Sequence, residues 1–323
     1  MNDYNSYFSE YIQGMLEARN ILGYSNESHA SVLCSFDRYC TQQHPECREL
    51  TEHLVMSWLL KDSNDTKGIQ GRASAIRLLA QYMNLSGQDA YLLPDRYFGN
   101  PKPKDTYLFT SQELTRLFAA VDSLPEDGRV PHSKTMLPVL FRLIYTCGLR
   151  PREGRELKRR NINLNTGEIL ITNTKKKKER FVVMSDDMLS VCRKYEKMRQ
   201  FFYEDNPYFF PGPSGGSLDG QWLNRQFHKC WRHANPGIPK DHLPSVRIYT
   251  LRHQFASANL NRWLDEGKDL EAMLPRLRAY MGHYTLAETA HYIHLIPESL
   301  VKNKGIDWKS FSGIIPEVEP WQE

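Results

Sequence analysis

One short stretch without periodicity, residues 96–107 (RYFGNPKPKDTY), limits the folds open to this chain. It carries two prolines, one glycine and three positive charges, a composition typical of a linker rather than of a helix or a strand. The 323 residues are enough for about two domains. We therefore expect a first domain at residues 1–95, a basic linker at 96–108, a second domain at 109–300 and a tail at 301–323.

The first of these domains is predicted to be a bundle of short helices. Apolar residues recur at helical spacing in four stretches, at residues 7–22, 32–40, 54–60 and 76–83. Gly23 ends the first stretch, and the segment SNDTKG with Gly71 predicts a loop between the third and the fourth. The apolar stripes are interpreted as the core of this bundle.

The second domain is predicted to combine helices with one β-hairpin. Thr110-Ser-Gln-Glu113 matches a capping box and precedes the apolar residues 114–124. The β-rich stretches EILIT (168–172) and RFVVM (180–184) flank a polar lysine turn, which predicts the hairpin. Further helices are predicted at 137–146 before Gly148, and at 186–204, 222–233, 249–262, 270–281 and 286–292. The predicted fold class is thus mainly α with a small β-hairpin, in two domains.

Positive charge is concentrated in the middle of the chain. Residues 141–180 hold 12 Lys and Arg against four Glu, a local balance of +8 within a total of only +4. A basic segment in an otherwise acidic protein indicates a polyanionic partner, and a solvated surface is the alternative that charge alone leaves open.

Composition argues against several other classes. A mean hydropathy of −0.58 and the lack of a long uncharged apolar run predict no membrane span. The polar, acidic N-terminus predicts no signal peptide. Six scattered cysteines without CxxC spacing predict reduced thiols in a cytoplasmic protein. Cys40, His44 and Cys47 could contact a metal, but no second ligand cluster follows, so neither a metal site nor a cofactor is expected.

Four motifs in order carry a resemblance to a known family. Cys147-Gly-Leu-Arg-Pro-Arg-Glu153 resembles the GLRxxE box of the tyrosine recombinase (phage integrase) family, and Tyr249-Thr-Leu-Arg-His-Gln-Phe-Ala256 resembles its HxLRHxFA box. Met281-Gly-His283 and, nine residues after that histidine, Tyr292 resemble its Gly-His box and nucleophilic tyrosine. The segment TKKKKER lies where the family has a hairpin lysine. The order, the spacing and the domain division agree over essentially the whole chain.

The resemblance implies a role for each of these residues in breaking a phosphodiester bond without metal or ATP. Tyr292 would be the nucleophile and would form a 3′-phosphotyrosyl bond. Arg150 and Arg252 would bind the phosphate oxygens, and His283 would donate an imidazole N–H to the same phosphate. Lys175, with Lys176 as the alternative, would protonate the departing 5′ oxygen.

Supporting roles are expected for Glu153, which would orient a neighbouring arginine, and for His253, which would buttress the site. Tyr280, Tyr284 and Tyr249 are the competing tyrosines, and only the spacing from Gly-His selects Tyr292.

The chain departs from the family pattern at two positions. Gly154 stands where the family typically has leucine or another apolar residue after the glutamate, so local helix packing is expected to differ. Tyr249 stands where the family commonly has histidine or lysine. A phenol can donate a hydrogen bond to phosphate, but it carries no positive charge at neutral pH. Tyr249 is therefore expected to belong to the site as a neutral hydrogen-bond donor.

The resemblance also implies a C-shaped clamp on double-stranded DNA core sites. The expected partners are DNA, three further copies in a tetramer on synapsed DNA (a monomer or dimer before synapsis) and, left open, accessory DNA-bending proteins. The tail would dock on a neighbouring protomer. The basic residues expected to contact DNA are Arg152, Arg155, Lys158, Arg159, Arg160, Lys176, Lys177, Lys178, Lys102 and Lys104.

The function expected from the resemblance is site-specific recombination, in the form of an integrase of a mobile element rather than a resolvase of chromosome dimers. Three alternatives stay open. They are a DNA-binding protein of this fold with impaired catalysis, a type IB topoisomerase-like enzyme that relaxes supercoils without choosing sites, and an RNA-binding protein supported by the basic segment alone.

Overall fold

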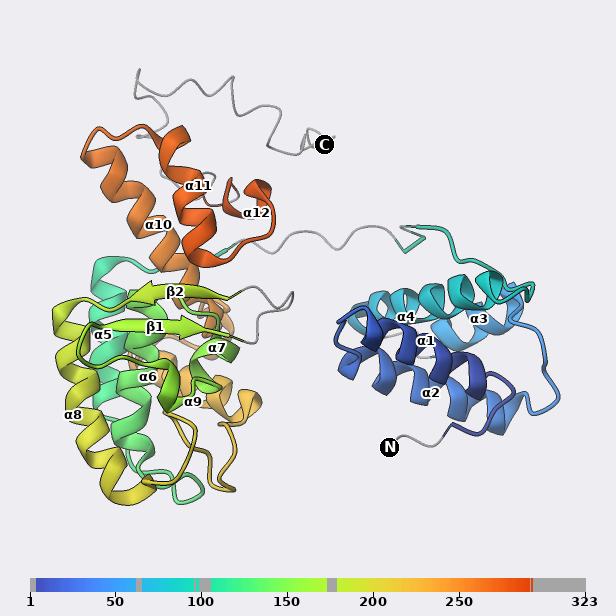
Figure 1. Cartoon of the computed structure of the whole chain (residues 1–323), viewed down its shortest axis with the longest axis horizontal. Helices are drawn as coiled ribbons and strands as arrows, with labels where there is room; N and C mark the ends of the chain where they lie inside the picture. The colour runs from blue at the N-terminus through green and yellow to red at the C-terminus, as the bar shows by residue number, and fades with distance from the viewer. Residues whose placement is uncertain are drawn as a thin grey trace. The chain divides into compact units, whose positions relative to one another are not determined.

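The computed structural model describes residues 4–61, 66–95, 97–98, 106–172, 179–290 and 292, with the backbone alone for residues 66 and 67. The chain divides into two compact units, Met1–Lys104 and Asp105–Glu323 (Figure 1). Most of the expected linker and all of the expected tail lie outside the described residues, so their boundaries stay predictions.

The first unit is a helical bundle, as the apolar stripes predict. Its helices are α1 (Ser9–Ile21), α2 (Glu27–Gln43), α3 (Glu52–Leu60) and α4 (Thr66–Leu85). Helix α4 packs against the other three. The rings of Phe8, Phe36 and Trp58 form the centre of the core, with centroids 5.6 Å apart between the first two and 5.0 Å between the last two. Burial of these large apolar side chains supplies most of the stabilisation of the bundle.

The predicted loop around Gly71 is wrong in part. Helix α4 begins at Thr66 and continues through Gly68 and Gly71. A Cβ added at Gly71 would meet nothing within 4 Å, so this position faces open space. Glycine in a helix costs about 1 kcal/mol relative to alanine, and the packing of buried residues further along α4, such as Ile76 and Leu79, outweighs that cost.

The second unit is built around one buried helix. Its elements are α5 (Ser111–Asp122), α6 (Ser133–Cys147), α7 (Pro151–Arg155), η1 (Arg159–Asn161), β1 (Glu168–Ile171), β2 (Arg180–Val183), α8 (Asp186–Tyr203), α9 (Gly220–His233), η2 (Lys240–His242), α10 (Tyr249–Asp265), α11 (Leu270–Met281) and α12 (Leu286–Ala290). Helix α6 is largely buried and contacts α5, α7, α8 and α10. The mainly helical fold class with one small sheet is confirmed.

Local signals place the ends of these elements as the sequence predicts. The capping box at α5 is present, with the Glu113 N–H donating to Thr110 Oγ1 (3.2 Å) and the Thr110 N–H donating to Glu113 Oε2 (2.8 Å). Gly148 ends α6 in the left-handed conformation with φ 61°. Both observations confirm the predicted helix boundaries.

The two strands form an antiparallel sheet, which confirms the predicted hairpin pairing. Leu170 is the partner of Phe181, and Ile171 is the partner of Arg180. Val182 is fully buried, whereas Phe181 and Val183 are exposed, so Arg180 and Val182 share the inward face of β2. The turn between the strands, with Lys175, Lys176, Lys177 and Lys178, lies outside the described residues.

The C-terminal helices form a smaller core of their own. Helices α10, α11 and α12 gather above the sheet in Figure 1, and α11 contacts β2. Leu260, Leu274, Met281 and Ala290 form this cluster together with Tyr292. In the described part of the chain, every helix is too short or too polar to cross a bilayer.

Candidate active site

The site lies where the end of α6, the start of α10 and the end of α11 meet. Gly148 permits this close approach, because a Cβ at this position would come within 2.4 Å of the Phe255 ring on α10. Its positive φ turns the chain from α6 into α7. Gly282, with φ 66°, ends α11 in the same way and is followed directly by His283.

Arg150 is the N-cap residue of α7 and is held at its guanidinium and its backbone. Its N–H donates to Glu153 Oε2 at 2.8 Å, and its Nη1 donates to Glu153 Oε1 at 2.8 Å. Its Nη2 donates to the carbonyl of Gly282 at 2.7 Å. These hydrogen bonds fix Arg150 in place. Since 27% of its side chain is exposed, it is still reachable from solvent.

Glu153 is the shared acceptor of the site. Arg180 donates to it through both terminal nitrogens, at 2.9 Å and 2.8 Å, a bidentate pair across 27 residues. The carboxylate is nearly buried, and burial alone would raise its pKa. The hydrogen bonds and charges of Arg180 and Arg150 outweigh burial and lower the pKa of Glu153 to about 2.

Arg252 is fully buried beneath this group. It donates from Nη1 to the Gly148 carbonyl (2.6 Å) and from Nη2 to the Met281 carbonyl (2.7 Å). Burial and the nearby charge of Arg150 lower the pKa of its guanidinium. Two backbone carbonyls, one at the C-cap of α6 and one at the end of α11, therefore fix a buried cation where these helices meet.

His283 is partly buried beside the arginines, an environment that favours its neutral form. Burial and then the charges of Arg252 and Arg150 lower the pKa of His283 to about 3. Its Nδ1 lies 2.9 Å from Thr289 Oγ1. The ring is parallel to the Tyr292 ring, with an interplanar angle of 16° and centroids 5.9 Å apart.

Tyr292 joins the same cluster with 3% of its surface exposed. Burial raises the pKa of its phenol to about 12, against the opposing effect of the charge of Arg252. Its Oη lies 3.1 Å from His253 Nδ1. The ring of Tyr249, the half-exposed first residue of α10, makes an edge contact with His253 at 4.9 Å between centroids.

The structure brings together most of the residues selected from the sequence. Those that meet in one cluster are Arg150, Glu153, Tyr249, Arg252, His253, His283 and Tyr292. Of the competing tyrosines, Tyr249 joins the cluster, whereas Tyr280 and Tyr284 lie outside it. Tyr280 Oη is near Val183, and Tyr284 is 56% exposed. Lys175 and Lys176 lie outside the described residues, so the choice between them stays a prediction.

Two site residues were missed by the sequence analysis. Arg180 was counted only as a positive charge, although it is the bidentate partner of Glu153. The alternation in β2 could have indicated it, because an arginine that shares the inward face of a strand with Val182 needs an acidic partner. Thr289, the contact of His283, carries no sequence signal of its own.

Gly154 is a packing position, consistent with the expected difference at this residue. It is buried in α7, and a Cβ there would come within 3.0 Å of Leu140 and 3.1 Å of Ile144. The lack of a side chain thus lets α7 lie close against α6.

The basic residues expected to contact DNA differ in how firmly the protein holds them. Arg155 donates to Ser217 Oγ and the Leu218 carbonyl, and Arg159 donates to Glu196. Arg152 pairs with Glu156 but keeps 60% of its side chain exposed, and Arg160 is exposed. Lys158 is half-buried, and Lys102 and Lys104 lie outside the described residues. Their contacts with DNA stay predictions.

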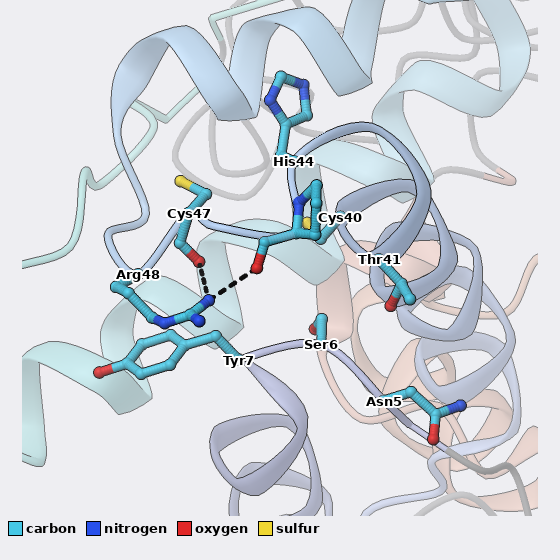
Figure 2. Close-up of a pocket in the computed structure, with 9 residues that line it drawn as sticks. Asn5, Ser6, Tyr7, Cys40, Thr41, His44, Cys47 and Arg48 are labelled. Carbon is cyan, nitrogen blue, oxygen red and sulfur yellow. Dashed lines mark hydrogen bonds between the residues drawn. The ribbon is translucent and has the colours of Figure 1, made fainter.

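The pocket that contains Cys40, His44 and Cys47 in the first unit does not form a ligand set. His44 Nε2 lies 3.1 Å from the Tyr39 hydroxyl, and the Cys47 thiol is directed at the Glu49 carbonyl. Figure 2 shows the His44 ring pointing away from Cys47. Across the described residues, no group of three or more His, Cys, Asp or Glu side chains is arranged to hold a metal ion.

Comparison with known proteins identifies the family. The model of the phage integrase family matches residues 107–298. The chain is 27% identical over 300 residues to a Sinorhizobium fredii protein described as an integrase/recombinase (y4rB), covering 91% of this chain and 94% of that protein. It is 28% identical over 255 residues to the tyrosine recombinase XerD of Pseudomonas aeruginosa, covering 76% of each.

Solved structures agree on the fold. The XerH site-specific recombinase bound to its difH substrate superposes with a TM-score of 0.62 at 19% identity, covering 92% of this chain and 84% of that one. The Tn1549 transposon integrase in complex with a circular intermediate DNA gives a TM-score of 0.62 at 12% identity, covering 87% and 94%. The chain belongs to the phage integrase family, and it is a tyrosine-type site-specific recombinase.

Proposed function

We propose that this recombinase cuts and rejoins DNA through a 3′-phosphotyrosyl intermediate on Tyr292, without metal or ATP. The observation that carries the proposal is the convergence of the buried Tyr292 and Arg252 with His253 and His283 in one cluster. A phenol fixed beside a buried cation is suited to attack a phosphodiester, because the cation stabilises the phenolate and the negative charge that develops on phosphorus.

In the proposed reaction, Tyr292 Oη forms a bond to phosphorus and the bond to the 5′ oxygen breaks. Arg150 and Arg252 would stabilise the phosphate oxygens through planar N–H donors. Arg150 is the more exposed of the two and would meet the phosphate first. Lys175, with Lys176 as the alternative, would protonate the 5′ oxygen.

His283 is proposed to donate a hydrogen bond to the phosphate as a neutral imidazole. If the Thr289 hydroxyl donates to Nδ1, the proton of the ring resides on Nε2, which can donate. With a pKa of about 3, His283 supplies no positive charge. Tyr249 likewise would contribute a neutral donor, so the charge in the transition state would rest on the arginines and the hairpin lysine.

Glu153 and Arg180 are proposed to act as positioning residues. The carboxylate holds Arg150 at two points, and the bidentate pair with Arg180 fixes the carboxylate against β2. This ion cluster would keep Arg150 in one orientation before DNA arrives, which reduces the entropy lost in the transition state.

The proposed substrate is double-stranded DNA with core sites recognised by both units. The two units, joined by the predicted linker, would hold the duplex as a clamp. The DNA-bound structures of XerH and the Tn1549 integrase support this proposal. We further propose a tetramer on synapsed DNA, a tail that docks on a neighbouring protomer, accessory DNA-bending proteins and a role in integrating or excising a mobile element. Such a protein would act at the nucleoid.

Covalent trapping tests the chemistry directly. The protein is mixed with EDTA and with nicked duplexes taken from the DNA that flanks its gene, and denaturing gels report any strand bound to protein. We expect an adduct with the wild type, none with Tyr292→Phe and a normal amount with the matched control Tyr284→Phe, since Tyr284 is exposed. Tyr292→Phe removes one hydroxyl, so DNA binding should remain.

Any result that differs from this expected adduct pattern supports one of the alternative hypotheses. An adduct in Tyr292→Phe would show that another tyrosine is the nucleophile. DNA binding without any adduct in the wild type would favour a catalytically impaired binding protein. Relaxation of supercoiled plasmids irrespective of sequence would favour the topoisomerase-like activity.

A further inference from the structure

His253 is placed to take part in the reaction itself rather than to support the site from outside. It follows Arg252 on α10, and its Nδ1 lies 3.1 Å from Tyr292 Oη, a hydrogen-bond distance. The two rings are 5.5 Å apart at their centroids and inclined by 53°, so they are not stacked face to face. A nucleophile and a base in this geometry form the usual unit of nucleophilic catalysis.

The phenol needs a base in this site. Burial raises the pKa of Tyr292 to about 12, so almost none of it is ionised at neutral pH. The charge of Arg252 favours the phenolate but offers no site to accept the proton, because a guanidinium stays protonated. The proton of Oη must therefore move to another group as the bond to phosphorus forms.

The other described side chains of the cluster are poorly suited to accept that proton. Glu153 is engaged by Arg150 and Arg180 on both oxygens, and its pKa of about 2 makes it a weak base. His283 directs Nδ1 at Thr289, its ring is parallel to that of Tyr292, and its pKa of about 3 also makes it a weak base. Tyr249, at the position where the family commonly has a basic residue, is a phenol that packs on His253.

We propose that His253 is the general base for Tyr292, an inference that rests on the proposed function of that tyrosine. The Oη proton moves to His253 Nδ1 while the bond from Oη to phosphorus forms and the bond from phosphorus to the 5′ oxygen breaks. The 5′ oxygen takes a proton from the separate acid, the hairpin lysine. In religation the 5′ hydroxyl returns its proton to that acid, and the imidazolium returns its proton to the departing phenolate.

The first test measures adduct formation in a single turnover at saturating protein on the nicked duplex. His253→Asn keeps a hydrogen-bonding group near the place of Nδ1 but cannot accept a proton at neutral pH. We expect adduct formation to slow by about 10²- to 10⁴-fold, with DNA binding retained in a gel-shift assay. His228→Asn, on the exposed side of α9, is the matched control and should react at the wild-type rate.

The second test separates the base from the acid. In a duplex with sulfur in place of the bridging 5′ oxygen, the leaving group departs without protonation. We expect this substrate to restore the rate of Lys175→Ala (or Lys176→Ala) and to leave His253→Asn slow. Added imidazoles should also accelerate His253→Ala, and more so the more basic the imidazole, because proton transfer follows basicity whereas space filling does not.

Three results would overturn the inference. A near-normal rate of His253→Asn would exclude a base at this position. Restoration of His253→Asn by the sulfur leaving group would assign His253 to leaving-group protonation. Rescue of His253→Ala by imidazoles regardless of their basicity would leave only a positioning role. If His253→Ala does not fold, the rates of His253→Asn on the nicked duplex and on the duplex with the bridging sulfur test the inference without it. Absence of any wild-type adduct would instead reject the proposed function.

Discussion

The bundle of the first unit and the active-site junction of the second unit, where α6, α7, α10 and α11 meet, bury different kinds of side chain. The bundle is centred on Phe8, Phe36 and Trp58, and its one buried charged residue in the described part is Asp37, which accepts from the Asn5 and Ser6 amides. The junction instead buries Arg252, together with the nearly buried pair of Glu153 and Arg180.

This difference indicates that the buried side chains of the bundle serve stability, whereas those of the junction serve the reaction. Apolar burial stabilises a fold without specifying any chemistry. Burying charges costs free energy unless each is paired and hydrogen-bonded, so such a cluster is weak evidence for stability. In the junction every arginine of the cluster is bound to Glu153 or to a carbonyl, and these contacts hold the groups around Tyr292. The bundle should therefore respond to substitution through stability and the junction through reaction rate.

Arg252→Ala should have the largest effect, because it removes the buried cation beside Tyr292. We expect adduct formation to slow by at least about 10²-fold, as for loss of one donor to a developing oxyanion. Single-turnover trapping on the nicked duplex measures this. The matched control is Arg199→Ala, which removes another buried arginine, one bound to the Tyr208 carbonyl far from the cluster. Equal slowing in both variants would mean that the effect reflects folding rather than chemistry.

Glu153→Gln should change how stability depends on pH. The folded pKa of Glu153, about 2, is below its unfolded value near 4.5, so its charge stabilises the fold above pH 4.5. This contribution disappears as the pH falls toward 2. A shift of this size corresponds to about 3 kcal/mol.

Urea unfolding of wild type and Glu153→Gln from pH 6 to pH 2.5 measures that contribution. The difference in unfolding free energy between the two proteins should narrow by about 2–3 kcal/mol toward the acid end. A constant difference over this range would show that the carboxylate is not held by Arg180 and Arg150 as described.

Tyr249→His should have a small effect on rate. The substitution restores the residue type that the family commonly has, at the first position of α10, where the side chain is half-exposed. We expect adduct formation within about 10-fold of wild type, or faster, because an imidazole can also donate to phosphate. An inactive Tyr249→His protein would assign the phenol a distinct role, for example through its contact with His253.

His44→Ala in the bundle should have the smallest effect of the four. Its ring contacts Tyr39, and neither the adduct rate nor the response of the melting temperature to EDTA should change. A drop in melting temperature on adding EDTA that is lost in His44→Ala would place a metal in the pocket of Figure 2.

Helix ends and the site motifs could be predicted because their signals are local. The capping box at Thr110 and the left-handed Gly148 each act within a few residues, and both lie where predicted. Gly71 shows the limit of such signals, since packing of the rest of α4 outweighs a local helix breaker. Arg180 shows a second limit, because its partner Glu153 lies 27 residues away on another element.

Local patterns in the sequence were enough to predict the division of the elements into two groups, the family and the order of the residues around Tyr292. The pairing of Arg180 with Glu153, the complete burial of Arg252 and the contact of His253 with the phenol are visible only once the chain is folded. This is because periodicity and capping act over a few residues. The distance between His253 and Tyr292, 39 residues apart, depends instead on how α10, α11 and α12 pack around their common core.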